Sequence, residues 1–137
     1  MVEPVTLREM EFSSVPENIN LIEVLVEELK AELGLSEEAE ANILVSLSEA
    51  VNNAIFHGNQ SDPQKKVKIS VEKLEKELVF CIEDQGVGFN DLEVKDPTAI
   101  ENLDKPTGRG IFLMRNLADR LEFCEGGRKV VITFLRG

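Results

Sequence analysis

Apolar residues recur at intervals of three and four in two segments of the chain, and this spacing predicts two amphipathic helices. The first apolar stripe consists of Ile19, Ile22, Val26, Leu29 and Leu33. Ser14 and Glu17 have the spacing of a capping box at its start, and Gly34 is expected to end the helix. Ser36 is expected to begin the next helix. The second stripe consists of Ile43, Leu47, Ala50, Val51 and Ala54, and Gly58 is expected to end that helix.

Strands are predicted where apolar and polar residues alternate. The opening run 5–12 alternates in part, and the run 66–72 alternates throughout. The run 78–82 is apolar on both faces, which is typical of a central strand. These three segments predict most of one sheet.

The end of the chain combines a third helix with a hairpin. The helix has an apolar stripe formed by Ile111, Met114, Leu117, Ala118 and Leu121. The runs 121–124 and 130–135 flank Gly126 and Gly127, which predict a two-residue hairpin turn. Because the helices are segregated from a mainly antiparallel sheet, an α+β fold with two layers is predicted.

Length and charge limit the kinds of function. The chain has 137 residues, the size of one domain, and no linker or repeat divides it, so a single domain over residues 1–137 is predicted. Its net charge is −11, which argues against direct binding to nucleic acid or to an anionic membrane. Neither a signal peptide nor an apolar stretch of about 20 residues is visible. One histidine and two cysteines without CxxC spacing argue against a zinc site, and reduced thiols in the cytoplasm are expected.

The first candidate for chemistry is the pair Glu49 and Asn53 on the second predicted helix. The two residues are four apart, so both side chains project from one helix face. A carboxylate beside a carboxamide oxygen can hold a hard cation such as Mg²⁺, or can place a base beside one. The alternative is a polar helix face that only contacts water. His57, near the end of the same helix, is expected to have a structural role, since an imidazole suits the negative end of the helix dipole.

The second candidate is the run 84–88 (Asp-Gln-Gly-Val-Gly), which directly follows the most apolar predicted strand. Gly86 and Gly88 allow the backbone to bend and to approach a flat ligand closely. The Asp84 carboxylate can then accept a hydrogen bond from an exocyclic amine such as that of adenine. An ordinary turn is the alternative.

The third candidate is the run 108–110 (Gly-Arg-Gly) at the start of the third predicted helix. A glycine-rich entry to a helix exposes unpaired N–H groups at the positive end of the dipole, which suits a phosphate. Arg109 and Lys105 can add positive charge, although simple loop flexibility also explains the glycines. The preceding stretch from Asp84 has no regular period, and so long an irregular segment in a compact domain is usually functional.

The order of these three motifs resembles the ATP-binding domain of the GHKL superfamily, with Glu49 to Asn53 as the N box and 84–88 and 108–110 as the two G boxes. The string SEAVNNAIFHG at 48–58 is similar to the anti-sigma-factor serine/threonine kinases of the RsbW and SpoIIAB type. The resemblance covers nearly the whole chain. It implies the Bergerat fold, with a mixed, mostly antiparallel sheet and helices on one face.

The resemblance also implies roles for individual residues. Asn53 resembles the Mg²⁺ ligand, Glu49 the catalytic carboxylate and Asp84 the residue that reads adenine. The remaining ATP-binding positions would be Gly86, Gly88, Lys105, Gly108, Arg109 and Gly110, and 90–107 would form the ATP lid. The family usually has a threonine soon after the last hairpin turn, whereas here Arg128 and Lys129 follow Gly127. Thr133 is then the candidate for the threonine contact to adenine.

By resemblance, the protein is an ATP- and Mg²⁺-dependent protein serine/threonine kinase and an anti-sigma factor. Its partners would be a sigma factor and a STAS-type anti-anti-sigma protein that it phosphorylates in a partner-switching system. A homodimer formed through the N-terminal strand and first helix is expected. The alternative is a module that binds ATP and controls another regulator without transferring phosphate.

Overall fold

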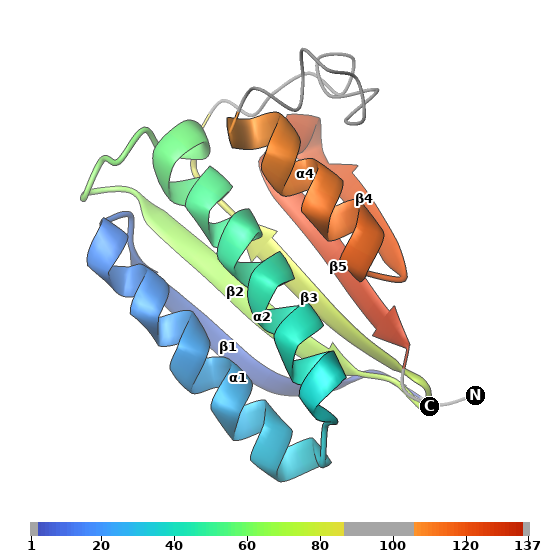
Figure 1. The fold of residues 1–137 in the computed structure, drawn as a ribbon. Coiled ribbons are helices and arrows are strands. Elements are labelled where there is room, and N and C mark those ends of the chain that lie inside the picture. Colours follow the sequence, from blue (N-terminus) through green and yellow to red (C-terminus); the bar gives the residue numbers. More distant parts are fainter. Residues whose placement is uncertain (1–2, 87–105, 136–137) are drawn as a thin grey trace.

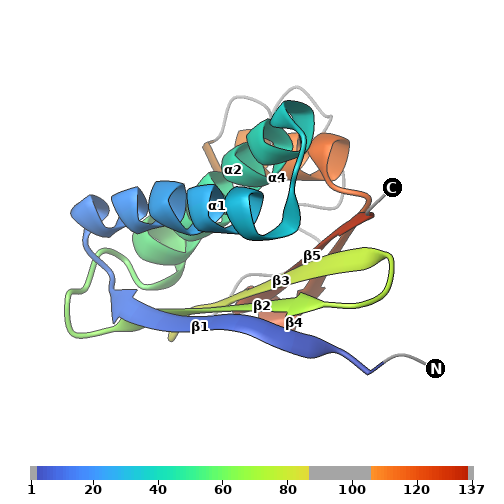
Figure 2. The same ribbon diagram turned by 90° about the horizontal axis from the view of Figure 1, so that it is seen from below.

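The computed structural model of the protein describes residues 3–86 and 106–135. Helices cover one face of a five-stranded sheet, so the described part of the chain has two layers (Figures 1 and 2). The strands are β1 (Val5–Ser13), β2 (Lys66–Lys73), β3 (Glu77–Glu83), β4 (Arg120–Cys124) and β5 (Lys129–Leu135). Their order across the sheet is β1-β2-β3-β5-β4. The predicted α+β two-layer fold is confirmed.

All pairings among the described strands are antiparallel, where a mixed sheet was expected. β2 and β3 form a hairpin, and β4 and β5 form a second one. β5 then pairs with β3, so the second hairpin adds to the sheet beside the first. This arrangement makes β3 the central strand, in agreement with its apolar sequence.

The helical layer contains α1 (Asn20–Leu33), α2 (Glu37–Asn52) and α4 (Pro106–Leu117). A short 3-10 turn, Pro16–Ile19, precedes α1. Gly34 ends α1 in the left-handed conformation with φ 67°, and the Ser36 side chain accepts a hydrogen bond from the Ala39 N–H at 3.0 Å. Both predicted helix boundaries are therefore confirmed, because the local chemistry at these positions is sufficient to set them.

The last turn of the second helix widens into a π-helical segment, Asn53–Gly58. The wider turn is closed by hydrogen bonds from Asn59 N to Ala54 O at 2.8 Å and from Ser61 N to Ile55 O at 2.7 Å. The helix does end at Gly58 as predicted, but not with α-helical geometry. Such wide turns are rare and often occur at functional sites.

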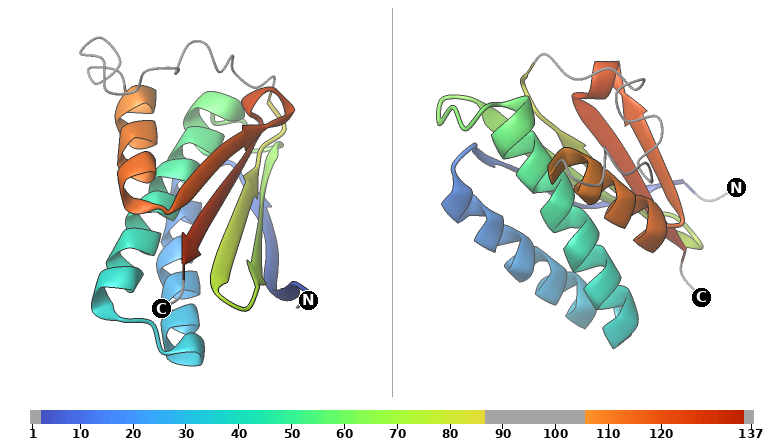
Figure 3. Two further views of the ribbon diagram at one scale, coloured as in Figure 1. Left: turned by 90° about the vertical axis from the view of Figure 1, so that its right-hand side faces the viewer. Right: turned by 45° about the horizontal axis from the view of Figure 1, so that its top comes forward.

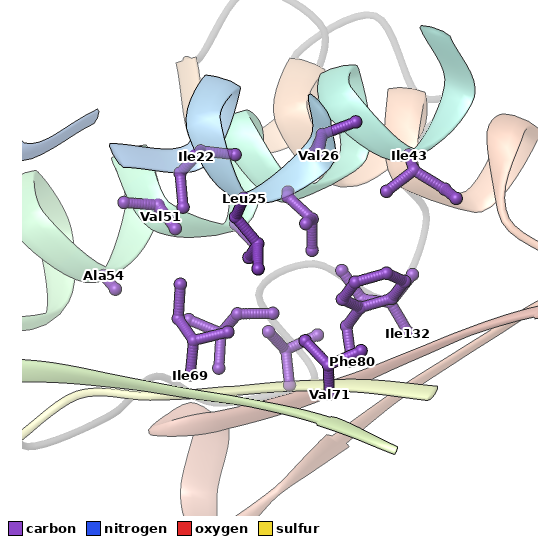
Figure 4. Packing of buried hydrophobic residues seen from close by; sticks show 14 of the residues in the cluster. Ile22, Leu25, Val26, Ile43, Val51, Ala54, Ile69, Val71, Phe80 and Ile132 are labelled. Atoms are coloured by element: carbon purple, nitrogen blue, oxygen red, sulfur yellow. The ribbon is translucent and has the colours of Figure 1, made fainter. Parts of the chain in front are cut away.

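The core lies between the two layers (Figure 4). The inward side chains of β2 alternate with polar ones, and Val67, Ile69 and Val71 are fully buried. They face the apolar stripes of α1 and α2, of which Ile22, Leu29 and Leu47 are also fully buried. Since burial of each such side chain contributes about 1.5–3 kcal/mol, this interface dominates the stability of the fold.

The capping box predicted at Ser14 is wrong. Val15, not Ser14, precedes the 3-10 turn, and no side chain caps it. Ser14 is buried, its Oγ donates to Lys65 O at 2.9 Å and it accepts from Asn59 Nδ2 at 2.6 Å. Partners distant in the sequence therefore replace the local cap.

The end of the third helix and the final turn also differ from the prediction. The helix ends at Leu117, and Leu121 belongs to β4. Cys124 pairs with Lys129, so the hairpin turn spans the four residues 125–128, where a two-residue turn was predicted. Glu125, Gly126 and Gly127 all have positive φ. The wider turn leaves residue 128 at the mouth of the pocket described below.

Both cysteines are free and half-buried. Among the described residues, no helix is long and apolar enough to cross a membrane.

Candidate nucleotide-binding site

A pocket is lined by the end of α2 with the π-helical segment after it, by α4 and by the β4–β5 turn. In Figures 1 and 3, the end of α2, the start of α4 and this turn lie at the same end of the molecule. The helical side contributes Ala50, Asn53, Ala54, His57, Gly58 and Met114 to its lining. The sheet side contributes Ile82, Asp84, Phe123, Gly127, Arg128 and Val130. An apolar floor with a few polar side chains at the rim is typical of a site for a small ligand.

Asp84 holds a fixed carboxylate inside this pocket. It directly follows β3 and is only 8% exposed. Its Oδ1 accepts a hydrogen bond from Gly86 N at 2.8 Å, and its own N–H donates to Arg128 O at 2.9 Å. Burial raises the pKa of Asp84, while the Gly86 N–H and the charge of Arg128 lower it. A carboxylate held in this way can accept a hydrogen bond from a ligand amine.

Gly58 and Gly86 are in close contact, and this contact explains both glycines. A Cβ on Gly86 would overlap the carbonyl group of Gly58, and a Cβ on Gly58 would overlap the Asp84 carboxylate. Neither glycine has a positive φ, so space rather than backbone conformation requires glycine here. Gly86 was expected to make room for a ligand, whereas the structure shows that it makes room for the backbone at the end of the second helix.

Glu49 and Asn53 lie beside the start of α4. A Cβ on Gly110 would be 2.8 Å from Glu49 Oε2 and 3.5 Å from Asn53 Nδ2. Burial raises the pKa of the half-exposed Glu49 carboxyl. The structure thus brings the N box together with the second glycine of the 108–110 run, at the edge of the pocket that contains Asp84.

Arg128 and His57 line the pocket, although neither was predicted to be a site residue. Arg128 lies opposite Asp84, one position beyond the pair formed by Lys129 and Glu83. Residues opposite each other in an antiparallel pair share a face, so both side chains lie on the pocket side. The register of the final hairpin, counted back from β5, was the signal that could have found Arg128.

Thr133 is not brought to this pocket. It lies on β5 between Ile132 and Phe134, and alternation places its side chain on the sheet face opposite to Val130 and Ile132. Thr133 is 4% exposed, and its backbone oxygen accepts from Asp119 N at 2.9 Å. The structure therefore gives no support to its proposed contact with adenine.

The remaining predicted residues lie partly outside the described chain. Gly88, Lys105 and residues 90–105 of the predicted lid fall outside it. Residues 106 and 107 of that lid belong to the first turn of α4, as do the backbones of Gly108 and Arg109.

The donor atoms at Glu49 and Asn53 suit a Mg²⁺ ion. Mg²⁺ prefers oxygen ligands and is usually bound by one or two protein groups together with substrate phosphates. No cluster of three or more metal-ligating His, Cys, Asp or Glu side chains occurs among residues 3–86 and 106–135. Glu49 and Asn53 thus offer oxygen donors of the kind that Mg²⁺ uses together with substrate phosphates.

The structure has the parts expected of a nucleotide-binding site of the GHKL kind. These are a carboxylate at a strand end, a polar pair on the adjoining helix and a glycine at the start of the next helix. A family model described as a histidine kinase-like ATPase domain matches residues 12–134. The chain therefore belongs to the histidine kinase-like ATPase domain family.

Within this family, the chain is similar to proteins named anti-sigma F factor. That of Shouchella clausii is 37% identical over 114 residues, which cover 81% of this chain and 77% of the relative. That of Clostridium perfringens is 34% identical over 129 residues, which cover 90% and 91%, respectively. That of Bacillus subtilis is 34% identical over 113 residues, with 80% and 77% covered. The resemblance seen in residues 48–58 is thereby confirmed.

A solved structure supports the fold. A protein of Mycobacterium tuberculosis that contains RsbU and RsbW domains matches with a TM-score of 0.63 and 15% sequence identity. The match covers 98% of this chain and 31% of that one.

Proposed function

We propose that this protein is an ATP- and Mg²⁺-dependent protein serine/threonine kinase that acts as an anti-sigma factor in the cytoplasm. Its substrate in this proposal is a serine or threonine of a STAS-type anti-anti-sigma protein, and it exchanges this partner for a sigma factor. The proposal is supported most by one observation, the placement of Glu49 and Asn53 against Gly110 beside the pocket that holds Asp84. The names of the anti-sigma F factor relatives support the choice of partners.

In this proposal, Asp84 accepts a hydrogen bond from the 6-amino group of adenine. The apolar floor formed by Ile82, Met114 and Val130 packs against the base. The N–H groups at the start of α4, with Gly108, Arg109 and Gly110, bind the phosphates. Gly88 and Lys105 belong to the same proposed set, and Thr133 does not.

Asn53 and Glu49 have separate roles in this proposal, in metal binding and in catalysis. The Asn53 side-chain oxygen would hold Mg²⁺, which offsets phosphate charge when bound. Glu49 orients the attacking hydroxyl and accepts its proton. Its raised pKa makes it a stronger base than an exposed glutamate, which suits this role. Phosphoryl transfer otherwise needs mainly positioning and charge stabilisation.

The test is transfer of labelled phosphate from ATP to a STAS-domain protein. We expect label on the partner with the wild type, and loss of transfer with unchanged ATP affinity for Glu49→Gln. Glu75→Gln is a matched control, because Glu75 is exposed in the turn between β2 and β3. ATP binding without transfer to any STAS protein would instead favour a non-catalytic partner-switching module. Absence of ATP binding would overturn both.

A further inference from the structure

Asn59, which follows the π-helical segment, is fully buried, and both of its side-chain N–H bonds and its side-chain oxygen have hydrogen-bond partners. Its Nδ2 donates to Ser14 Oγ at 2.6 Å and to Lys66 O at 2.9 Å, and its Oδ1 accepts from Gln85 N at 2.7 Å. Its own backbone N–H closes the wide turn on Ala54 O. Burying a carboxamide is costly unless it is bonded in this way.

The partners of Asn59 come from separate parts of the chain. Ser14 follows β1, Lys66 begins β2, and Gln85 belongs to the loop that leaves β3. Gln85 is held a second time, because its Oε1 accepts from Lys66 N at 2.5 Å. The loop after β3 is thus tied to the end of the second helix and to the start of β2.

These hydrogen bonds hold Gln85, the residue that follows Asp84. The Asp84 carboxylate accepts its hydrogen bond from Gly86 N, so its orientation depends on the backbone at Gln85 and Gly86. That backbone is held by the Asn59 bond to Gln85 N and by the packing of Gly86 on Gly58. Asn59 itself is not among the residues that line the pocket.

We propose that Asn59 is a positioning residue for base recognition, because its buried carboxamide fixes the loop that aims the Asp84 carboxylate at the base. This inference rests on the proposed function, since it assumes that Asp84 reads the 6-amino group of adenine. Asn59 contacts no ligand and acts only through Gln85 and Gly86.

The test compares affinity for ATP with affinity for purine ribonucleoside triphosphate, which lacks the 6-amino group. The ratio of the two dissociation constants, measured by titration calorimetry on the full chain, reports base reading and does not depend on the folded fraction. We expect Asn59→Ala to reduce the wild-type preference for ATP by roughly tenfold, because a misplaced Asp84 carboxylate would lose its hydrogen bond to the 6-amino group. Loss of one hydrogen bond to a charged group has an effect of this size. The double variant with Asp84→Asn should have the same ratio as Asp84→Asn alone.

Ser14→Ala is the matched control. It removes another hydrogen bond of the same carboxamide but leaves the bond to Gln85, so the ratio should stay at the wild-type value even if the protein is less stable. Gln85→Ala removes only the bond to Lys66 N from an exposed side chain, and it should lower the ratio by a smaller factor.

The outcomes separate this inference from the function on which it rests. An unchanged ratio in Asn59→Ala, when Asp84→Asn lowers it, would overturn the positioning role alone. If Asn59→Ala does not fold, an unchanged ratio in Gln85→Ala overturns it. An unchanged ratio in Asp84→Asn, or no preference for ATP in the wild type, would instead overturn base reading by Asp84.

Discussion

At the scale of single residues, both carboxyl groups of the site are held where their charge is disfavoured. Burial raises the pKa of Asp84 and of Glu49. A raised folded-state pKa contributes stability that is present at low pH and lost as pH rises through that pKa. The two groups therefore lower the stability of the free protein at neutral pH, which is common for residues kept for function.

We predict that Asp84→Asn stabilises the protein without nucleotide and weakens ATP binding. The asparagine Oδ1 can still accept from Gly86 N, while the buried charge is removed. ATP affinity should fall by about ten- to hundredfold, the effect of losing a hydrogen bond to a charged group. Urea unfolding should show the variant more stable at neutral pH, with the difference shrinking as pH is lowered toward the ordinary aspartate pKa. A difference that grows on acidification would contradict the assignment.

Gly110→Ala tests the contact between α4 and Glu49. The new methyl group would lie 2.8 Å from Glu49 Oε2, so the carboxylate has to move. We expect phosphotransfer to fall at least tenfold while ATP affinity changes less, because Glu49 is displaced. Alanine is favoured over glycine in a helix by about 1 kcal/mol, so the thermal midpoint should not drop much. Asn116→Ala, on an exposed part of α4, serves as the control and should leave transfer intact.

Ser46 on α2 has a buried hydroxyl group that makes no hydrogen bond. Among the described residues, its Oγ is the only buried side-chain nitrogen or oxygen that has no hydrogen-bond partner. Ser46→Ala should therefore raise the free energy of unfolding by about 1 kcal/mol, with unchanged ATP affinity. Denaturant titration measures the first and calorimetry the second. Destabilisation would mean that the hydroxyl has a partner.

At the scale of elements, local signals predicted most helices and strands. The end of α1 at Gly34, the start of α2 at Ser36 and strand β2 could each be predicted from residues adjacent in sequence. Along β5, Val130 and Ile132 occupy the core face, so alternation places Thr133 on the other face, which was not considered when Thr133 was predicted to contact adenine. Ser14 and the geometry at the end of the second helix were misjudged, and both have partners distant in sequence.

Ser14 and the end of the second helix show why distant partners matter. Ser14 bonds to Asn59 and Lys65 rather than to its own helix turn, and Asn59 ties down the π-helical segment. Gly58 needs to be small because of Asp84, which is 26 positions away by the numbering of the chain. Motif spacing singled out residues that the structure brings together, but only the packed structure shows how they are held.

At the scale of the whole molecule, β1 and α1 form one edge and present apolar side chains to solvent. Leu21 and Val24 on α1 are 37% and 53% exposed, and Val5 on β1 is also exposed. These residues support the proposed homodimer through this edge.

We therefore expect the double variant Leu21→Glu, Val24→Glu to sediment as a monomer where the wild type sediments as a dimer. Both side chains are partly solvated already, so the fold should persist with an unchanged circular dichroism spectrum. Leu113→Glu, an exposed apolar position on α4, is the control and should remain dimeric. A wild type that is monomeric at micromolar concentration would remove the proposed homodimer.

The contact between Gly58 and Gly86 has a consequence for how the sequence can change over time. A larger residue at position 86 meets the main chain at position 58, and backbone cannot rotate away as a flexible side chain can. Libraries that randomise position 86 alone should return glycine. Related sequences that lack this glycine should also have insertions or deletions near position 58, so positions 58 and 86 should change together.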